Sequence, residues 1–134
     1  MSRAAVLAAL RNDATLNAIV PANNIIPNYS KEGRPANLSP GPFLILRWGD
    51  QRAERAVGGR GPRDLVIWAH YPTDKSTDFD DVDEILAEVD RVLLAIDDDT
   101  VTDISPAGGK SGDLTDPAFD TIVRNVAYEV LSRT

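Results

Sequence analysis

The chain has 134 residues, no cysteine and a formal net charge of −7. This length fits a single domain, large enough to bury roughly two-thirds of the surface of the unfolded chain. The lack of cysteine excludes disulfide and thiolate-metal frameworks, and the acidic balance argues against general tight binding to nucleic acid. No apolar run reaches the length of a membrane span, about 20 residues, so synthesis in the cytoplasm is expected.

The charge is divided along the chain. Residues 1–67 carry nine basic and five acidic side chains, a balance of +4, whereas residues 68–134 carry five basic and sixteen acidic side chains, a balance of −11. One end of the chain can therefore attract the other end of a neighbouring copy. Two solvated faces would account for the division equally well.

The N-terminal segment predicts a helix followed by an extended arm. Val6, Leu7 and Leu10 recur at helical spacing, with Ser2 as a candidate N-cap, and a second short turn ends at Pro21. Five of the nine prolines then lie at positions 21, 27, 35, 40 and 42, which rules out a long regular element. We expect a long loop at 27–42, preceded by a short strand near residues 25 and 26.

Two runs rich in β-branched and aromatic residues predict central strands. They are "PFLILRW" at 42–48 and "DLVIWAHYP" at 64–72, each bounded by Gly or Pro. The segment 49–63 between them contains several glycines and predicts a long hairpin loop. The basic residues of this loop are Arg52, Arg55, Arg60 and Arg63.

An amphipathic helix of about four to five turns follows, with Thr77 or Asp78 as its candidate cap. Its apolar residues keep the spacing of a helix that packs on a sheet by one face. They are Val82, Ile85, Leu86, Val89, Val92, Leu93 and Ile96. Asp80, Asp83 and Glu84 lie within one turn, but such spacing is common on solvated helix faces and no EF-hand pattern is present.

The C-terminal part predicts a short strand at 100–105, a loop at 105–118 and a long closing strand. Along that strand, Ile122, Val126, Tyr128 and Val130 share one face. The order of elements predicts one α+β domain over residues 1–134. We expect a mostly antiparallel four-stranded sheet, with the N-terminal helix and the long amphipathic helix packed on it.

The stretch "PAGGKSGD" at 106–113 ends like a phosphate-binding P-loop. That motif needs a glycine five residues before its last one, and this position is Ile104. The motif should also run into a helix, whereas the residues after Ser111 are loop-like. We therefore expect a glycine-rich surface loop and no nucleotide site.

His70 is the only histidine, and it lies inside a predicted strand. It could serve as a general base, but no nucleophile is organised around it, which favours a packed histidine. The arginines of 49–63 lack interleaved aromatic residues, so contact with an acidic protein surface is favoured over contact with DNA. The sequence offers no catalytic, metal or cofactor constellation, and this favours a role in assembly.

The whole layout resembles the tail terminator, or tail-completion, proteins of long-tailed phages, the group that includes the terminator of phage lambda. The features that carry the resemblance are the opening "AAVLAALRNDATLNAIV" with "NNIIPNY" after it, the strand "PFLILRWGD", the strand "DLVIWAHYPTD" leading into "DDVDEILAEVDRVLLAI", and the closing "TIVRNVAYEVLSR". They extend over nearly the full chain.

The resemblance implies a virion protein without catalytic activity or cofactor. Such proteins form a ring, usually of six copies, on the head-proximal end of the tail tube, stop tube growth and join the head connector. Phage DNA would pass through the ring without specific binding, no membrane would be involved, and assembly would take place in the host cytoplasm. The alternatives are another neck ring protein, such as a connector or stopper, and a small enzyme that uses His70.

By the same resemblance, two loops are expected at an interface or in the lumen. They are the loop from Arg52 to Arg63 and the loop from Gly108 to Gly112, whose Lys110 would meet an acidic neighbour or face the channel. The acidic residues expected at the interface are Asp80, Asp81, Glu84, Glu88, Asp97, Asp98 and Asp99.

Overall fold

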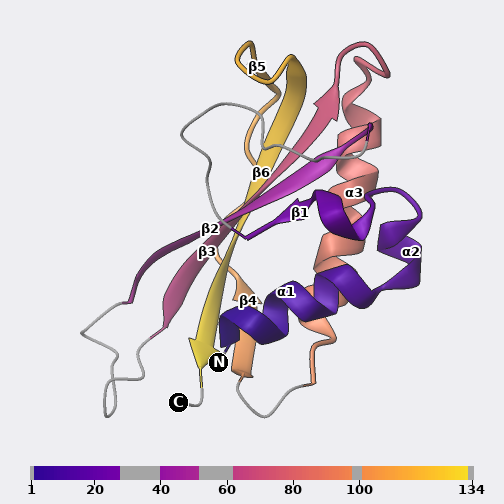
Figure 1. The fold of residues 1–134 in the computed structure, drawn as a ribbon. Helices are drawn as coiled ribbons and strands as arrows, with labels where there is room; N and C mark the ends of the chain where they lie inside the picture. Colours follow the sequence, from indigo (N-terminus) through magenta and orange to yellow (C-terminus); the bar gives the residue numbers. More distant parts are fainter. Residues whose placement is uncertain (1, 28–39, 52–61, 98–100, 133–134) are drawn as a thin grey trace.

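The computed structural model describes residues 2–27, 40–51, 62–97 and 101–132, and these residues form a twisted sheet with helices on one face (Figure 1). The helices are α1 (Ser2–Asn12), α2 (Ala14–Asn17) and α3 (Phe79–Leu94), with a short 3-10 turn at Ala22–Asn24. The strands are β1 (Ile25–Ile26), β2 (Phe43–Gln51), β3 (Arg63–Pro72), β4 (Val101–Pro106), β5 (Leu114–Asp116) and β6 (Thr121–Ser132). The α+β class is confirmed.

The sheet has six strands, so the prediction of four was wrong. Its order is β1-β2-β3-β6-β4, and β5 pairs with β6 outside this path. Only β1 runs parallel to its neighbour, β2, and the other pairs are antiparallel. The two additional strands are the short ones: β1 coincides with the strand expected near residues 25 and 26, and β5 lies inside the predicted loop at 105–118.

The centre of the sheet is the pair of β3 and β6. Their register runs from Arg63 opposite Val130 to Pro72 opposite Thr121 without a shift. Because side chains alternate between the faces of a strand, this register places the apolar sets of both strands on the same face, toward the helices. The predicted face of β6 is confirmed, since Ile122, Val126, Tyr128 and Val130 all belong to the main core.

Helix α3 covers that face with a continuous apolar stripe. Asp78 is its N-cap, and its carboxylate accepts a hydrogen bond from the backbone N–H of Asp80 at 2.9 Å. Of the two candidate caps, the structure therefore selects Asp78. The buried residues of α3 are Val82, Ile85, Leu86, Val89, Val92 and Leu93, as the spacing predicted. Ile96, predicted in the same set, lies beyond the end of α3 and is half-buried.

Replacing Asp78 with Ala is expected to lower the free energy of unfolding by about 1 kcal/mol, because the N–H of Asp80 loses its acceptor. Chemical denaturation followed by circular dichroism measures this. Thr77→Ala is the matched control: Thr77 is exposed and next to the cap, so its effect should stay within about 0.5 kcal/mol. Equal losses in the two variants would contradict the assignment of the cap.

Polar contacts fix the N-terminal helices to the sheet and to α3. Asp13 caps α2 by accepting from the N–H of Leu16 at 2.9 Å, and it also pairs with Arg91 of α3 at 2.6 Å. The guanidinium of Arg11 donates from Nε and Nη2 to the carbonyl of Ile25 at 3.2 and 2.6 Å. These contacts hold α1 and α2 against β1 and α3.

The other face of the sheet carries a smaller apolar cluster at one end. Phe43, Ile45 and Phe119 are buried there, and Trp68 packs against them. This cluster therefore covers one end of the second face.

Candidate functional site

The predicted basic loop at 49–63 is shorter in the structure than in the prediction. Strand β2 extends to Gln51 and β3 begins at Arg63, while Arg52, Arg55 and Arg60 lie outside the described residues. Arg63 was wrongly assigned to the loop. Its Nε donates to the carbonyl of Gly49 at 3.2 Å, and its guanidinium carbon lies 5.8 Å from the centroid of the Trp48 ring, so it holds the end of the β2–β3 pair together.

The predicted loop at 105–118 runs along the edge of β6. Strands β4 and β5 pair with the two ends of the same edge, and the segment between them bridges the gap. The backbone N–H of Ala107 and Ser111 donate to the carbonyls of Ala127 and Asn125, both at 2.9 Å, and the N–H of Asn125 donates to Ser111 Oγ at 3.0 Å. Strand β5 follows this segment, at the place where a P-loop would run into a helix.

Lys110 lies on this anchored segment with its side chain exposed. Gly108 has a φ of +110°, a conformation that favours glycine and lets the chain leave β4 before it returns to β6 at Ser111. The bonds at Ser111 fix the backbone next to Lys110. The lysine is thus held at the sheet edge by its neighbour and presented to solvent.

Arg124 connects this segment to α3, a contact that the sequence analysis missed. Its Nε donates to the carbonyl of Ser111 at 2.9 Å and lies 3.8 Å from the carboxylate of Asp113, while its Nη1 forms an ion pair with Asp83 of α3. The Arg124 side chain is 19% exposed, so these contacts are largely shielded from solvent. Arg124 is therefore the residue that fixes the loop relative to the helix.

Arg124→Met is expected to lower the free energy of unfolding by about 2 kcal/mol, because the carboxylate of Asp83 and the carbonyl of Ser111 lose their charged donor while the aliphatic packing is retained. It should also raise protease cleavage between residues 107 and 113. Thermal unfolding and limited proteolysis measure the two effects. Arg47→Met, at an exposed arginine of β2, should change neither, and similar losses in both variants would contradict this role of Arg124.

The acidic residues predicted at an interface divide into two groups. Asp81 accepts from Ser76 Oγ at 2.6 Å and Glu88 pairs with Arg91 at 2.8 Å, so both stabilise their own helix. The exposed members are Asp80, Glu84 and Asp97, whereas Asp98 and Asp99 lie outside the described residues.

Tyr128 and Asp90 form a further polar contact that no local sequence pattern indicates. Tyr128 lies in the core at 0% exposure, and its hydroxyl donates to the carboxylate of Asp90. Burial, together with this acceptor, raises the pKa of Tyr128. The contact joins the middle of α3 to β6.

His70 lies in the apolar cluster on the second face, as the packed alternative predicted. It is 3% exposed, its ring stacks on Phe43 with centroids 4.6 Å apart, and its Nδ1 lies 2.8 Å from Thr121 Oγ1. Burial lowers the pKa of His70 to about 4. A neutral ring enclosed in this way is poorly placed to act as a general base toward a substrate in solution.

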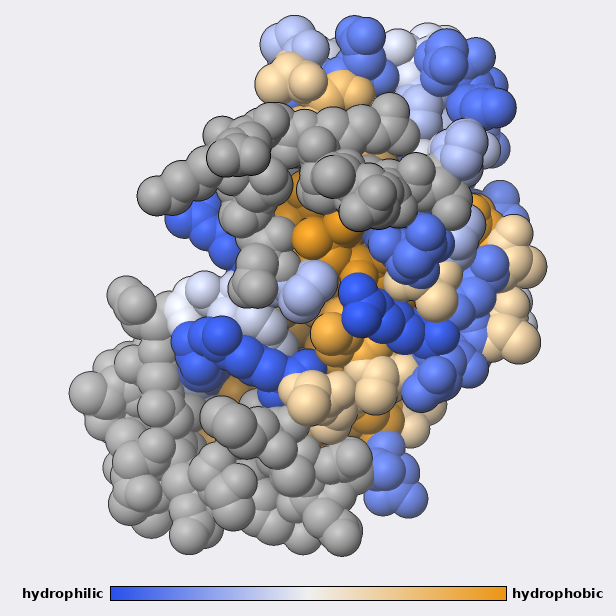
Figure 2. Space-filling view, viewed as in Figure 1, coloured by the Kyte–Doolittle hydropathy of each residue, from blue (hydrophilic) through white to orange (hydrophobic). Residues whose placement is uncertain are grey.

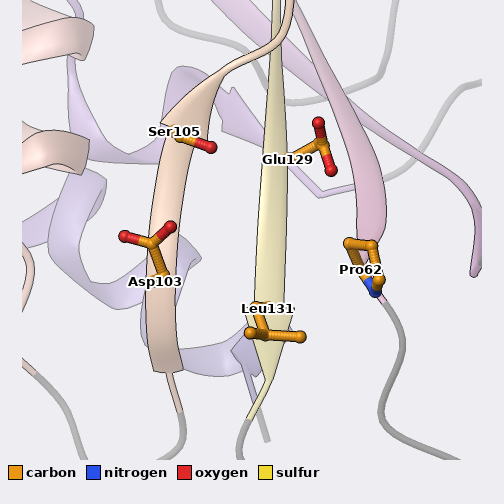
Figure 3. A pocket seen from close by; sticks show the side chains of 5 residues that line it. All are labelled: Pro62, Asp103, Ser105, Glu129 and Leu131. Carbon is orange, nitrogen blue, oxygen red and sulfur yellow. The ribbon is translucent and has the colours of Figure 1, made fainter. Parts of the chain in front are cut away.

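A pocket of about 150 Å³ lies on the second face at the opposite end of the sheet (Figure 3). Asp103 and Ser105 of β4 and Glu129 and Leu131 of β6 line it, with Pro62 across from them. Two carboxylates give it an acidic character. Within the described ranges, no group of three or more His, Cys, Asp or Glu side chains is placed to hold a metal ion.

A groove of about 390 Å³ lies between α1 and the C-terminal end of α3. Small and apolar side chains share its lining with polar and charged ones. The lining residues are Ala5, Ala8, Ala9, Asn12, Asp13, Arg91, Val92, Ala95, Ile96 and Asp97. Figure 2 shows weakly hydrophobic residues gathered on the surface over α1.

None of the described helices combines the length and the apolar character that a membrane crossing requires. No protein-family model and no curated protein matches the sequence. A solved chain from "Virion of native gene transfer agent (GTA) particle" is similar in structure, with a TM-score of 0.68 and 16% sequence identity, and the match covers 97% of this chain and 92% of that chain. The domain therefore shares, over nearly its full length, the fold of a chain in a gene transfer agent virion.

Proposed function

We propose that this chain is a structural virion protein that forms a ring on the head-proximal end of a phage tail tube. The ring stops tube polymerisation and offers the surface to which the head connector joins. The observation that carries the proposal is the shared fold with a chain of a gene transfer agent virion, over 97% of this chain. The resemblance of the sequence to tail terminators supports the specific position in the particle.

The surface of the described residues suits assembly of this kind. Several polar side chains stabilise the fold through contacts within the chain. His70 is buried, and intramolecular hydrogen bonds or ion pairs hold Arg63, Arg124, Asp83 and Glu88. Lys110 and Asp97 are exposed, carry opposite charges and lie in different connecting segments. Opposite charges at separate places on the surface suit a head-to-tail contact between identical subunits.

The first experiment is light scattering behind size exclusion, over a wide range of concentration, with negative-stain microscopy of the largest species. We expect rings of about six copies with an open centre. Purified tail-tube protein is then allowed to polymerise with and without this chain, and tube lengths are measured by microscopy. The chain should shorten tubes at a molar ratio far below one and should be found at one tube end.

Tubes of unchanged length would contradict a role as terminator. If rings form and bind the portal-side connector instead of the tube end, the chain is another neck ring protein. If the free protein is monomeric, the tube assay still tests whether the chain stops tube growth, because the tube end can act as the template for the ring.

A further inference from the structure

Two backbone edges of the sheet have no neighbouring strand among the described residues. Strand β1 pairs with β2 only at Leu44 and Ile45, so the rest of β2, residues 46–51, forms one open edge, here called the β2 edge. Strand β4 pairs only with β6, and its other side forms the β4 edge. Figure 1 shows the two on opposite sides of the sheet, with β3 and β6 between them. The free N–H and C=O groups of such an edge can bind a further strand.

Arg47 is an exposed cation on the β2 edge. Its guanidinium has no hydrogen-bond or ion-pair partner among the described residues. Side chains alternate between the faces of a strand, and Leu46 packs in the main core, so Arg47 lies on the second face. Its neighbours there, along β2 and directly across on β3, are Ile45, Gly49 and Val66, none of which is charged. Arg47 is thus a cation that the fold itself leaves unpaired.

Asp103 is an exposed carboxylate on the β4 edge, and it too has no partner among the described residues. It lies on the second face with Ser105, since Ile104 between them packs in the main core. Both line the pocket of about 150 Å³, with Glu129 next to them on β6 (Figure 3). None of the described residues that line this pocket is basic. Its acceptor oxygens suit a guanidinium, and Leu131 offers an apolar surface to the aliphatic stem of an arginine.

We infer that the β2 edge of one copy of this chain pairs with the β4 edge of a second copy, and that Arg47 enters the acidic pocket beside Asp103. The inference rests on the proposed function, since it names the contact by which copies join in a ring. A contact between two different edges is heterologous and leads to a ring when the rotation closes. The sheet would then continue from each copy into the next.

The directions of the strands permit this pairing. Strands β2 and β6 run one way and β3 and β4 run the other, because each neighbouring pair from β2 to β4 is antiparallel. A rotation about an axis along the strands leaves these directions unchanged. Strand β2 of one copy therefore meets β4 of the next in the antiparallel arrangement, which already joins these strands within one copy.

The lengths of the two edges set the register. Strand β4 has six residues, and the β2 edge, from 46 to 51, has as many. Full overlap places Arg47 opposite Ser105 and leaves Asp103 as its diagonal neighbour, which a long side chain can reach. In the same register Trp48 falls opposite Ile104, and both pack on the main core. The apolar face and the charged face therefore both continue across the contact.

Charge disfavours the symmetric alternatives. Pairing of β4 with β4 of a second copy would bring two Asp103 carboxylates together, and pairing of β2 with β2 would bring two Arg47 guanidinium groups together. Like charges on adjacent strands are destabilising. Of these three pairings, only that of β2 with β4 joins opposite charges.

Cysteine cross-linking tests the contact directly, because the chain has no cysteine of its own. Two single variants, Arg47→Cys and Ser105→Cys, are mixed under mild oxidation at the highest soluble concentration. Main-chain hydrogen bonds supply the affinity in strand addition, so the pairing should survive the loss of the guanidinium. We expect a reducible dimer, formed at least about tenfold faster than the dimer of Arg47→Cys with Thr115→Cys, since a disulfide needs close and aligned Cβ atoms. Thr115 is exposed on β5, at the other end of β6 from β4.

Carbodiimide coupling gives a second readout, for the charged pair itself. Arg47→Lys keeps the cation and supplies an amine, which a carbodiimide joins to a carboxylate only when the two are in contact. With chains of light and heavy isotope composition mixed, mass spectrometry should find a link between copies that joins position 47 to Asp103. Glu84→Gln, at an exposed carboxylate of α3, should leave the yield of this link unchanged. Absence of the link would overturn the place of Arg47 in the pocket.

The outcomes separate this contact from the ring itself. A disulfide rate equal to that of the Thr115 control, or a dimer formed by either single variant alone at the same rate, overturns the contact whether or not rings are seen. Rings without the disulfide would leave the proposed function in place with another interface. A disulfide that forms in a chain without rings and without effect on tube length would support the contact and contradict the proposed function.

Discussion

Lowering the pH from about 7 to about 4 is expected to remove about 3 kcal/mol from the free energy of unfolding through His70 alone. Burial lowers the pKa of His70 from 6.5 to about 4 in the folded chain. Between these values the unfolded chain binds more protons than the folded chain, so stability falls as the pH falls. The contribution is complete above pH 6.5 and is lost as the pH decreases through this window.

His70→Gln isolates this contribution, since glutamine can keep a hydrogen bond to Thr121 and does not titrate. Denaturant unfolding of both proteins at several pH values gives the difference in stability. That difference should change by about 3 kcal/mol across the window, in favour of the wild type at higher pH. Carboxylates titrate in both proteins and cancel. If the free energy of unfolding depends on pH in the same way in both proteins, the pKa of His70 is not lowered in the folded chain, and the prediction is wrong.

Leu86→Ala is expected to lower the free energy of unfolding by about 3 kcal/mol, within the range of 2–5 kcal/mol typical of such changes in a core. Leu86 is fully buried between α3 and the sheet, so the change removes apolar contacts and leaves a cavity. Thermal unfolding should show a lower midpoint with the transition still cooperative.

Leu94→Ala is the matched control on the same helix. Leu94 is 51% exposed, and the same chemical change there should cost less than about 0.5 kcal/mol. Similar losses at both positions would mean that the helix packs in a different orientation from the one described.

Elements with strong periodicity were predictable from the sequence. The spacing of the apolar residues from Val82 to Leu93 predicts both that a helix forms there and which face of it is buried. The run from Leu44 to Trp48 and the run from Leu65 to Tyr71 likewise became paired strands. In α3 burial on one side repeats at the period of the helix, whereas β2 is recognised by a continuous apolar run that is buried on both faces.

The short and long-range features were not predictable. Strand β5 has only three residues and its first two are exposed, so it carries no alternation, and its pairing with β6 alone defines it. Arg124 and Asp83 are 41 positions apart, and nothing local links them. Arg63 lies at the boundary between a loop and a strand. Local sequence patterns determine the ends of helices and strands less well than their centres.

The residues predicted at an interface differ in how they are engaged within the fold. Lys110, Asp80, Glu84 and Asp97 are exposed, as an interface requires, but exposure does not show a partner. Asp81 and Glu88 are engaged within the chain, because a charge near a helix end or one turn from an opposite charge forms a local contact first. The sequence lists charges and does not reveal which are already neutralised.

Strand β6 follows every strand with which it pairs, and this order has a consequence for biosynthesis. While the ribosome is still translating the segment before Thr121, β3, β4 and β5 have been made but lack their shared neighbour. The exposed backbone edge of β3 can then pair with other chains. Completion of the sheet must wait until residues 121–132 have been translated. Slow or interrupted synthesis before that point should therefore yield aggregates, and a chaperone that shields strand edges should improve recovery.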